Sequence, residues 1–180
     1  MSKEQGFQNW LAVAFVYRAW TLAKDGDLER GIKELREGIA LFRGIGARLT
    51  LVGMYAMVGD ALLLAGDAQE AVAALDEGIC EAEARTEHLH EPELYRLRGE
   101  ALRRLGAREA EASFRQALAL ARQQRARPLS LRAALSLTRS LGSDRPGEAQ
   151  RLLEEEYRGF TQGFETPDLQ EARLQLAALA

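Results

Sequence analysis

The sequence predicts an all-α protein built from stacked helical hairpins. The 180-residue chain contains only 4 Pro and is rich in Ala, Leu, Glu and Arg, the residue types that favour helix most. Segments of related sequence recur about every 40 residues along the chain. No stretch alternates Val, Ile or Thr with polar residues, which is the pattern of a half-buried strand. Composition, repeat and missing strand pattern therefore agree on one fold class.

The repeat is clearest in three segments that share one order of residue types. An aromatic residue is followed four positions later by a small residue, and then by Leu and Gly. These positions are Phe15, Ala19, Leu22 and Gly26, then Tyr55, Gly59, Leu62 and Gly66, then Tyr95, Gly99, Leu102 and Gly106. A small, large, small series follows each glycine. It is Gly31, Leu35 and Gly38, then Ala71, Leu75 and Gly78, then Ala110, Phe114 and Ala117.

The physical meaning of this order is a helical hairpin. The aromatic, small and Leu positions share one face of a first helix, because residues three and four apart are neighbours there. The small residue lets the second helix approach closely, and the large residues fill the space around it. Glycine supplies the positive φ that ends the first helix. A single hairpin cannot bury its apolar stripe, so consecutive hairpins must stack.

The helix boundaries follow from the same register. We expect hairpins at about 8–24 with 28–43, 47–65 with 68–84, 91–105 with 108–124, and 128–141 with 147–158. We expect one domain over residues 1–180, with repeats at about 8–45, 46–86, 87–126 and 127–159, and a capping helix at about 167–178.

The segment that ends the sequence, "GFTQGFETPDLQEARLQLAALA", predicts this cap. Thr166 suits the N-cap position and Pro167 the first helical position. Leu169, Leu174 and Leu176, with Ala172 or Ala177, are expected to form one apolar face on the fourth hairpin. A terminal repeat needs such a helix to cover its open core.

Charge and cysteine content narrow the class of protein. The net charge is −3, and the nine arginines in residues 101–140 are interleaved with Ala and Leu at helical spacing. That spacing favours a solvated helix face over a nucleic-acid site.

The single cysteine, Cys80, excludes an intrachain disulfide, and its apolar neighbours predict a buried, inert thiol. Because no apolar run approaches the ~20 residues that span a bilayer, we expect a cytoplasmic protein that binds neither membranes nor nucleic acid.

The sequence carries no recognisable catalytic or metal-binding pattern. A phosphate-binding G-x-x-x-x-G-K-[ST] loop is missing. His88 and His90 are two residues apart, which places them on opposite sides of a helix. The run of glutamates at 154–156 spreads around a helix and does not pair two carboxylates. We therefore expect a protein that is not an enzyme and holds no cofactor or metal.

The order of residues in the repeat resembles the tetratricopeptide (TPR) consensus, although its period is near 40 and not 34 residues and each closing Pro is missing. Longer segments carry a narrower resemblance. "ELYRLRGEALRRLG", "EAEASFRQALALARQQRARPLSLRAALSLTRSL" and "YRGFTQGFETPDLQEARLQL" resemble the C-terminal TPR-like region of bacterial predicted ATPases fused to class III adenylate or guanylate cyclase domains. The resemblance implies a module that senses a partner or ligand and controls attached catalytic domains.

In the TPR family the first helix of each hairpin lines a groove that receives a protein or peptide. The resemblance implies groove positions at Trp20, Lys24, Asp60, Glu93, Arg96, Glu100, Arg104, Arg132 and Arg139, and also at Val13, Val16, Gly53, Ala56 and Leu64. The four arginines could form a basic strip for a partner that carries carboxylates. Trp20 either anchors a partner or packs on the next repeat, and the sequence leaves both open.

Three functions are compatible with these features. The first is a protein–protein interaction or sensor module, the regulatory region of a bacterial signalling ATPase or cyclase, whose partner is such a catalytic domain. The second is a regulatory domain that binds a small-molecule effector. The third is a homo-oligomeric scaffold, suggested by Trp10, Phe15 and Trp20 in the apolar first helix.

Overall fold

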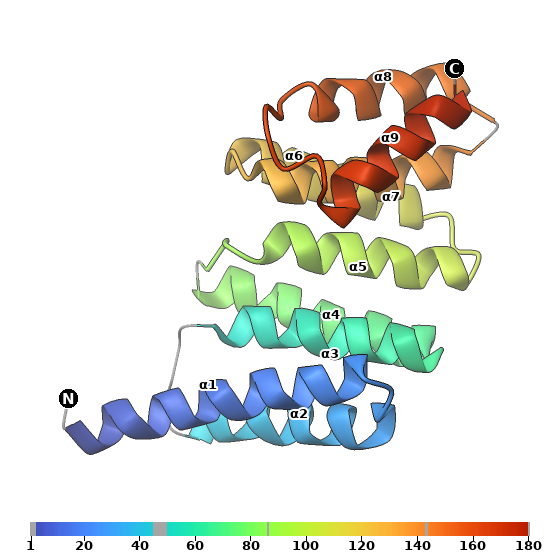
Figure 1. Ribbon diagram of the computed structural model, residues 1–180. Coiled ribbons are helices and arrows are strands. Elements are labelled where there is room, and N and C mark those ends of the chain that lie inside the picture. The colour runs from blue at the N-terminus through green and yellow to red at the C-terminus, as the bar shows by residue number, and fades with distance from the viewer. Residues whose placement is uncertain (1–2, 45–49, 86, 143, 180) are drawn as a thin grey trace. The chain divides into compact units, whose positions relative to one another are not determined.

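The computed structural model describes residues 3–44, 50–85, 87–142 and 144–179, and these form nine α-helices and no strand (Figure 1). The helices are α1 (Lys3–Lys24), α2 (Leu28–Gly44), α3 (Leu51–Ala65), α4 (Ala68–Arg85), α5 (Glu91–Arg104), α6 (Ala110–Gln123), α7 (Arg127–Leu141), α8 (Pro146–Tyr157) and α9 (Pro167–Leu179). The predicted all-α fold of helical hairpins with a C-terminal helix is confirmed. The predicted start of the third helix, residue 47, lies outside the described residues.

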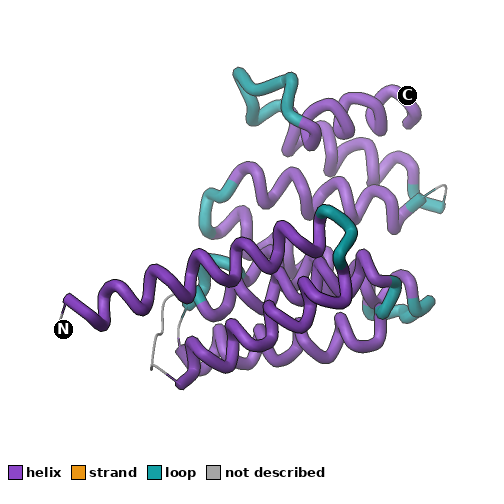
Figure 2. Tube along the Cα trace, turned by 60° about the horizontal axis from the view of Figure 1, so that its bottom comes forward, coloured by secondary structure: helices purple, strands orange, loops and turns teal. Residues whose placement is uncertain are grey.

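The chain divides into two compact units, Met1–His90 and Glu91–Ala180. The first unit contains the hairpins α1–α2 and α3–α4, and the second contains α5–α6, α7–α8 and α9. Within the described residues, the two helices of each of the first three hairpins are joined by short loops, and a longer loop over residues 158–166 joins α8 to α9 (Figure 2). Inside each unit the first helix of the second hairpin packs on both helices of the first, α3 on α1 and α2, and α7 on α5 and α6. Each unit is thus a stack of two repeats.

The turn of each of the first three hairpins is set by glycine. Gly26, Gly66 and Gly106 have φ angles of 104°, 84° and 69°, which confirms the predicted left-handed conformation. At the second turn the Gly66 amide donates to the carbonyl of Leu63 at 3.2 Å, and the Asp67 amide donates to Leu62 at 3.0 Å. These bonds satisfy carbonyls at the end of α3 that have no partner inside the helix.

The two helices of a hairpin touch where the first helix carries a small residue. A Cβ added to Gly59 would lie 2.5 Å from Cδ2 of Leu75, and one added to Gly99 would lie 2.5 Å from Cε1 of Phe114. Leu75 and Phe114 are completely buried. Their side chains therefore occupy the space that any larger residue at these positions would need, as the repeat predicts.

The C-terminal helix α9 packs on α7 and α8. Leu169 and Ala172 are its buried residues, whereas Leu174 is 67% exposed, so the predicted place of Leu174 on the apolar face is wrong. Leu174 is five residues from Leu169, a spacing that turns it away from the face shared by positions three and four apart. The turn before α9 is held by ring contact between Tyr157 and Phe164, whose centroids are 5.9 Å apart.

The prediction of a buried Cys80 is also wrong, because this thiol is exposed on α4. Its neighbours in sequence, Gly78 and Ile79, are buried against the rest of the unit. Cys80 is the next residue along the helix and is rotated out of that face. The apolar residues next to Cys80 in the sequence therefore did not indicate which side of the helix the cysteine occupies.

Replacing Gly59 by Leu should lower the free energy of unfolding by about 1–3 kcal/mol, because the new side chain overpacks the buried contact with Leu75. Chemical denaturation measures this loss. Gly147 is a matched control, since it also lies in a helix but a Cβ there meets no atom within 4 Å. Equal stability of the Gly59→Leu and Gly147→Leu variants would contradict the role assigned to the small residue.

Candidate functional site

The nine positions implied by the groove register separate into two groups. Trp20, Lys24 and Asp60 belong to the first unit, and Glu93, Arg96, Glu100, Arg104, Arg132 and Arg139 belong to the second. Val16 and Ala56, also implied by the register, are buried. Val16 packs over Gly38 inside its own hairpin, so it is not available to a partner and its groove assignment is wrong.

In the first unit, Trp20 contacts the next repeat. Its indole Nε1 donates to Oδ2 of Asp60 on α3 at 3.1 Å. The Lys24 ammonium lies 2.6 Å from the same oxygen and 5.5 Å from the centre of the Trp20 ring. Of the two roles that the sequence leaves open for Trp20, the structure shows packing between α1 and α3. The partly buried Asp60 carboxylate is the centre of this group.

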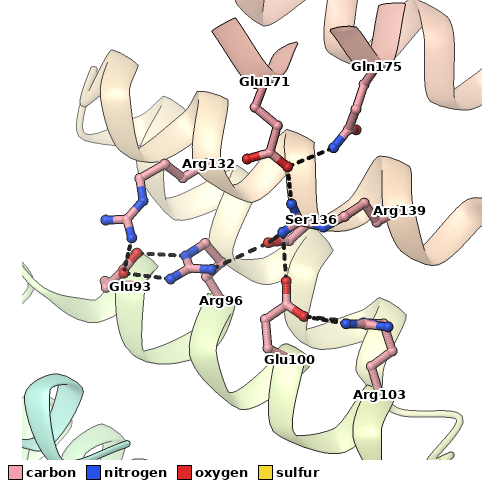
Figure 3. Close-up of polar contacts among 9 residues, drawn as sticks. All are labelled: Glu93, Arg96, Glu100, Arg103, Arg132, Ser136, Arg139, Glu171 and Gln175. Carbon is pink, nitrogen blue, oxygen red and sulfur yellow. Dashed lines mark hydrogen bonds and ion pairs between the residues drawn. The ribbon is translucent and has the colours of Figure 1, made fainter. Parts of the chain in front are cut away.

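In the second unit, most of the implied positions meet in one polar cluster, which we call the Arg–Glu network (Figure 3). It comprises Glu93, Arg96, Glu100, Arg103, Arg132, Ser136, Arg139, Glu171 and Gln175. The side chains come from α5, α7 and α9, and α7 packs on both of the other helices. Arg104 is exposed in the last turn of α5.

One half of the network is centred on Glu93. Arg96 donates to both carboxylate oxygens, from Nε at 2.9 Å and from Nη2 at 2.8 Å. Arg132 of α7 approaches the same carboxylate at 3.0 Å. Arg96 is buried, with only 9% of its surface exposed. A bidentate pair of this kind fixes the orientation of both side chains, because two parallel hydrogen bonds allow one geometry.

The other half is centred on Glu100, which is also buried. Arg103 donates to its Oε2 at 3.0 Å, and Arg139 of α7 donates to Oε1 at 2.9 Å. Arg139 also pairs with Glu171 of α9, and Gln175 donates to Glu171 at 2.9 Å. The Ser136 hydroxyl accepts from Arg139 at 3.2 Å. Arg139 therefore links α5 to α9 through α7.

The electrostatic balance of the network favours the ionised form of Glu100. Burial acts to raise the pKa of this carboxyl, but hydrogen bonds from Ser136, Arg139 and Arg103 outweigh burial, and the pKa is lowered from 4.5. Glu100 is therefore an anion at neutral pH. Its single negative charge is shared by Arg103 and Arg139, which would otherwise repel each other.

The structure corrects the predicted basic strip. Arg96, Arg132 and Arg139 do lie together, but each is paired with a glutamate of the same surface. The result is a surface of alternating charge. Sequence reasoning missed Arg103, Ser136, Glu171 and Gln175. A signal was present, because Glu93 and Arg132 are 39 residues apart, as are Glu100 and Arg139. One repeat length separates residues that face each other on successive first helices.

A second feature of the first unit is a pocket of about 320 Å³. Its lining residues are Arg36, Ile39, Ala40 and Arg43 of α2, Tyr55 and Val58 of α3, and Glu70, Ala73, Ala74 and Glu77 of α4. Arg36 pairs with Glu70, and Tyr55 donates its hydroxyl to Glu77 at 3.3 Å. Burial, together with Glu77 and Glu81, raises the pKa of Tyr55 to about 12 against the opposing effect of Arg43. The phenol is therefore a permanent donor in the pocket at neutral pH.

Comparison with known proteins identifies the fold. No protein-family model and no curated protein matches the chain. Among solved structures, a putative kinesin light chain from Podospora anserina with nearly identical TPR-like repeats superimposes with a TM-score of 0.70 at 19% identity, over 92% of this chain and 83% of that one. A variant of that kinesin light chain gives a TM-score of 0.72 at the same identity and coverage. The fold is TPR-like.

The TPR-like fold agrees with the general resemblance seen in the repeats, and at 19% identity the likeness concerns fold alone. The described residues lack two further features. They contain no helix long and apolar enough to cross a bilayer. Nor do they bring together three His, Cys, Asp or Glu side chains in a group that could hold a metal ion.

Replacing Glu100 by Gln should lower the free energy of unfolding by about 1–3 kcal/mol at pH 7, because two arginines lose an anionic partner. Since folding lowers the pKa of Glu100 from 4.5, the stability it contributes is complete above that value. The contribution is lost as the pH falls through the lowered, folded-state pKa. Urea unfolding at pH 7 and pH 3 should show the difference between wild type and variant shrinking in acid. The exposed loop residue Glu165 provides a control as Glu165→Gln, and a difference that is independent of pH would argue against an ionised Glu100.

Proposed function

We propose that this TPR-like chain is a non-catalytic protein-interaction module, and that the face of α5 and α7 binds an acidic helical segment of its partner. We further propose that the module is the regulatory region of a bacterial signalling ATPase or adenylate/guanylate cyclase. The proposed binding of an acidic helix is supported by a contact within the chain itself. The helix α9 lies on α7 and directs carboxylates at its arginines, as a bound helix would (Figure 3).

The contacts of α9 define the chemistry of the proposed ligand. Asp168 lies 3.9 Å from Nε of Arg132, and Glu171, one helical turn later, pairs with Arg139. Arg132 and Arg139 are seven residues apart on α7. Two guanidinium groups separated by two helical turns thus meet two carboxylates of a crossing helix. A partner helix with acidic residues at similar spacing fits the same groups.

Burial divides the network into a fixed part and an exchangeable part. The Glu93 and Glu100 side chains are 16% and 11% exposed, whereas those of Asp168 and Glu171 are 45% and 43% exposed. Exposed ion pairs contribute about 0–1 kcal/mol, so exchanging these ion pairs for those of a partner costs little as long as Leu169 and Ala172 keep α9 packed on its unit. Glu93 and the buried Glu100 meanwhile keep the arginines in place. The proposed site is therefore organised before the partner arrives.

The ATPase or cyclase context rests on the sequence resemblance of three long segments. The last of these, "YRGFTQGFETPDLQEARLQL", includes the turn before α9 and most of α9 itself. The segment that carries the resemblance thus also supplies the carboxylates that contact α7. A regulatory role for this surface would explain why one segment carries both the resemblance and the carboxylates that contact α7.

The proposal predicts that Arg132→Glu/Arg139→Glu weakens capture of a purified ATPase or cyclase domain encoded in the same reading frame or beside it. The loss should be roughly tenfold or more, because repulsion replaces two charge-assisted contacts. Arg96 is not a suitable target, since it is buried and its loss would disturb the fold. Quantitative pull-down or calorimetry with both proteins purified measures the effect.

A matched control for this experiment is Arg122→Glu. Arg122 lies on α6, is 40% exposed like the two targets, and also pairs with glutamates, at 2.9 Å and 2.7 Å. It should leave binding unchanged while perturbing the surface charge similarly. Equal losses in the α6 and α7 variants, or binding that both tolerate, would remove the α5–α7 face from the interaction.

A second candidate function, binding of a small-molecule effector, is favoured by the pocket between α2 and α4. In the repeat register, its residues Ala73 and Ala74 correspond to Arg151 and Leu152 of the second unit, so the first unit has space where the second has large side chains. The arginines that line the pocket belong to α2, and the glutamates belong to α4. A zwitterion with a small apolar body matches this distribution of charge.

This candidate predicts a rise in melting temperature with one or more zwitterionic metabolites, because a ligand of the folded state stabilises it. Replacing Ala74 by Leu, the residue found at the corresponding position of α8, should fill the pocket and abolish the rise. Ala112→Leu, at an exposed position of α6, is the control and should keep it. A rise that survives Ala74→Leu would place the ligand elsewhere.

A further inference from the structure

The pocket between α2 and α4 contains one carboxylate without a matching cation. Its two arginines are each paired with a glutamate, Arg36 with Glu70 and Arg43 with Glu81. Glu77 also lines the pocket, and it forms no ion pair with any residue that the structure describes. Two arginines and three glutamates therefore leave one net negative charge at this site. Such a charge at the lining of a pocket attracts a ligand of opposite sign.

A neutral donor from α3 contacts the Glu77 carboxylate. The side chain of Tyr55 is buried, and its hydroxyl donates to Oε2 of Glu77 at 3.3 Å, longer than the usual O–H···O distance of about 2.7 Å. Because burial raises the pKa of Tyr55 to about 12, the phenol is uncharged at pH 7 and does not offset the carboxylate. This long hydrogen bond holds Glu77 at the pocket and leaves its negative charge available to a ligand.

The second unit matches the corresponding carboxylate with arginines. In the repeat register Glu155 of α8 corresponds to Glu77, and it pairs with Arg122 at 2.9 Å. Arg151 lies one helical turn before Glu155, whereas Ala73 lies one turn before Glu77. The first unit thus lacks both the ion pair and the neighbouring guanidinium. It has a pocket beside the carboxylate instead, in which a ligand can supply the positive charge.

The rest of the pocket is apolar and small. Ile39 and Val58 are buried, and Ala40, Ala73 and Ala74 add their methyl groups to the lining. A volume of about 320 Å³ lies at the lower end of the range for ligand pockets, about 300–1,000 Å³. A ligand that matches this lining has a short aliphatic body and one positively charged end.

We propose that the pocket binds a small aliphatic amine in its ammonium form, with the charged group at Glu77 and the aliphatic body against Ile39 and Val58. This binding mode rests on the effector-binding function proposed above and adds the group that the ligand must carry. A carboxylate on the same molecule is optional, because Arg36 and Arg43 already have partners. Amines should therefore bind whether or not they are also amino acids.

Calorimetric titration of the full chain with three compounds that share one aliphatic body tests this binding mode. Leucine carries both an ammonium and a carboxylate, isopentylamine carries the ammonium alone, and isocaproate carries the carboxylate alone. At pH 7 and constant ionic strength, leucine and isopentylamine should bind and raise the melting temperature, because a ligand of the folded state stabilises it. Isocaproate should do neither.

Replacing Glu77 by Gln should weaken the binding of both amines roughly tenfold or more, because a charge-assisted contact is lost. The new amide oxygen can still accept the hydrogen bond from Tyr55, so the circular dichroism spectrum should not change. Glu155→Gln, the corresponding change in the second unit, is the matched control and should bind like the wild type. Ala74→Leu should abolish binding by filling the pocket.

The outcomes separate the amine assignment from the effector-binding function. Isocaproate that binds as tightly as isopentylamine, or equal affinity in the wild type and Glu77→Gln, would overturn the amine assignment. The effector-binding function would survive either result if Ala74→Leu still abolished binding. Failure of both amines to bind would also overturn the assignment, and a rise in melting temperature with another metabolite would then support the effector function alone. Binding that persists in Ala74→Leu would remove the pocket from both.

Discussion

The close approach of two helices at one small residue is the constraint on which the rest of the structure depends. Gly59 lies against Leu75 and Gly99 against Phe114, and in both places a Cβ would occupy space already filled by a buried side chain. This contact fixes how the second helix of a hairpin sits on the first. The contact occurs once in each unit, at positions 40 residues apart, and so follows the register of the sequence repeat.

That register decides which polar groups meet. Trp20 and Asp60 are 40 residues apart and hydrogen-bonded, and Glu100 and Arg139 are 39 apart and ion-paired. The same rule operates on the second helices, where Arg36 pairs with Glu70 in the first unit and Arg115 pairs with Glu148 at the equivalent positions of the second. The second helices therefore repeat one contact in both units, whereas the first helices display different chemistry on the same backbone arrangement. Function in such a fold resides in the side chains that the register brings together.

Buried and exposed charges have separate roles in the Arg–Glu network. Glu93 and the buried Glu100 hold arginines of α5 and α7 in one orientation, since removing a partner from a buried pair is costly. The exposed pairs between α7 and α9 contribute little by comparison. A surface organised in this way combines rigid cations with replaceable anions.

The sequence by itself determined the helices, their turns and the positions of close packing. These features depend on local helix propensity and on a repeat whose equivalent positions can be aligned from their spacing alone. Gly66, with its positive φ, and Gly59, with its crowded Cβ position, were both readable from the repeat. Only the tertiary structure decided which helix covers each face and which side chain each charge meets. Cys80 and Leu174 proved exposed, Trp20 packed on α3, and the arginines found glutamates one repeat away. Helical periodicity says which residues share a face, but the neighbour of that face is set by packing between hairpins.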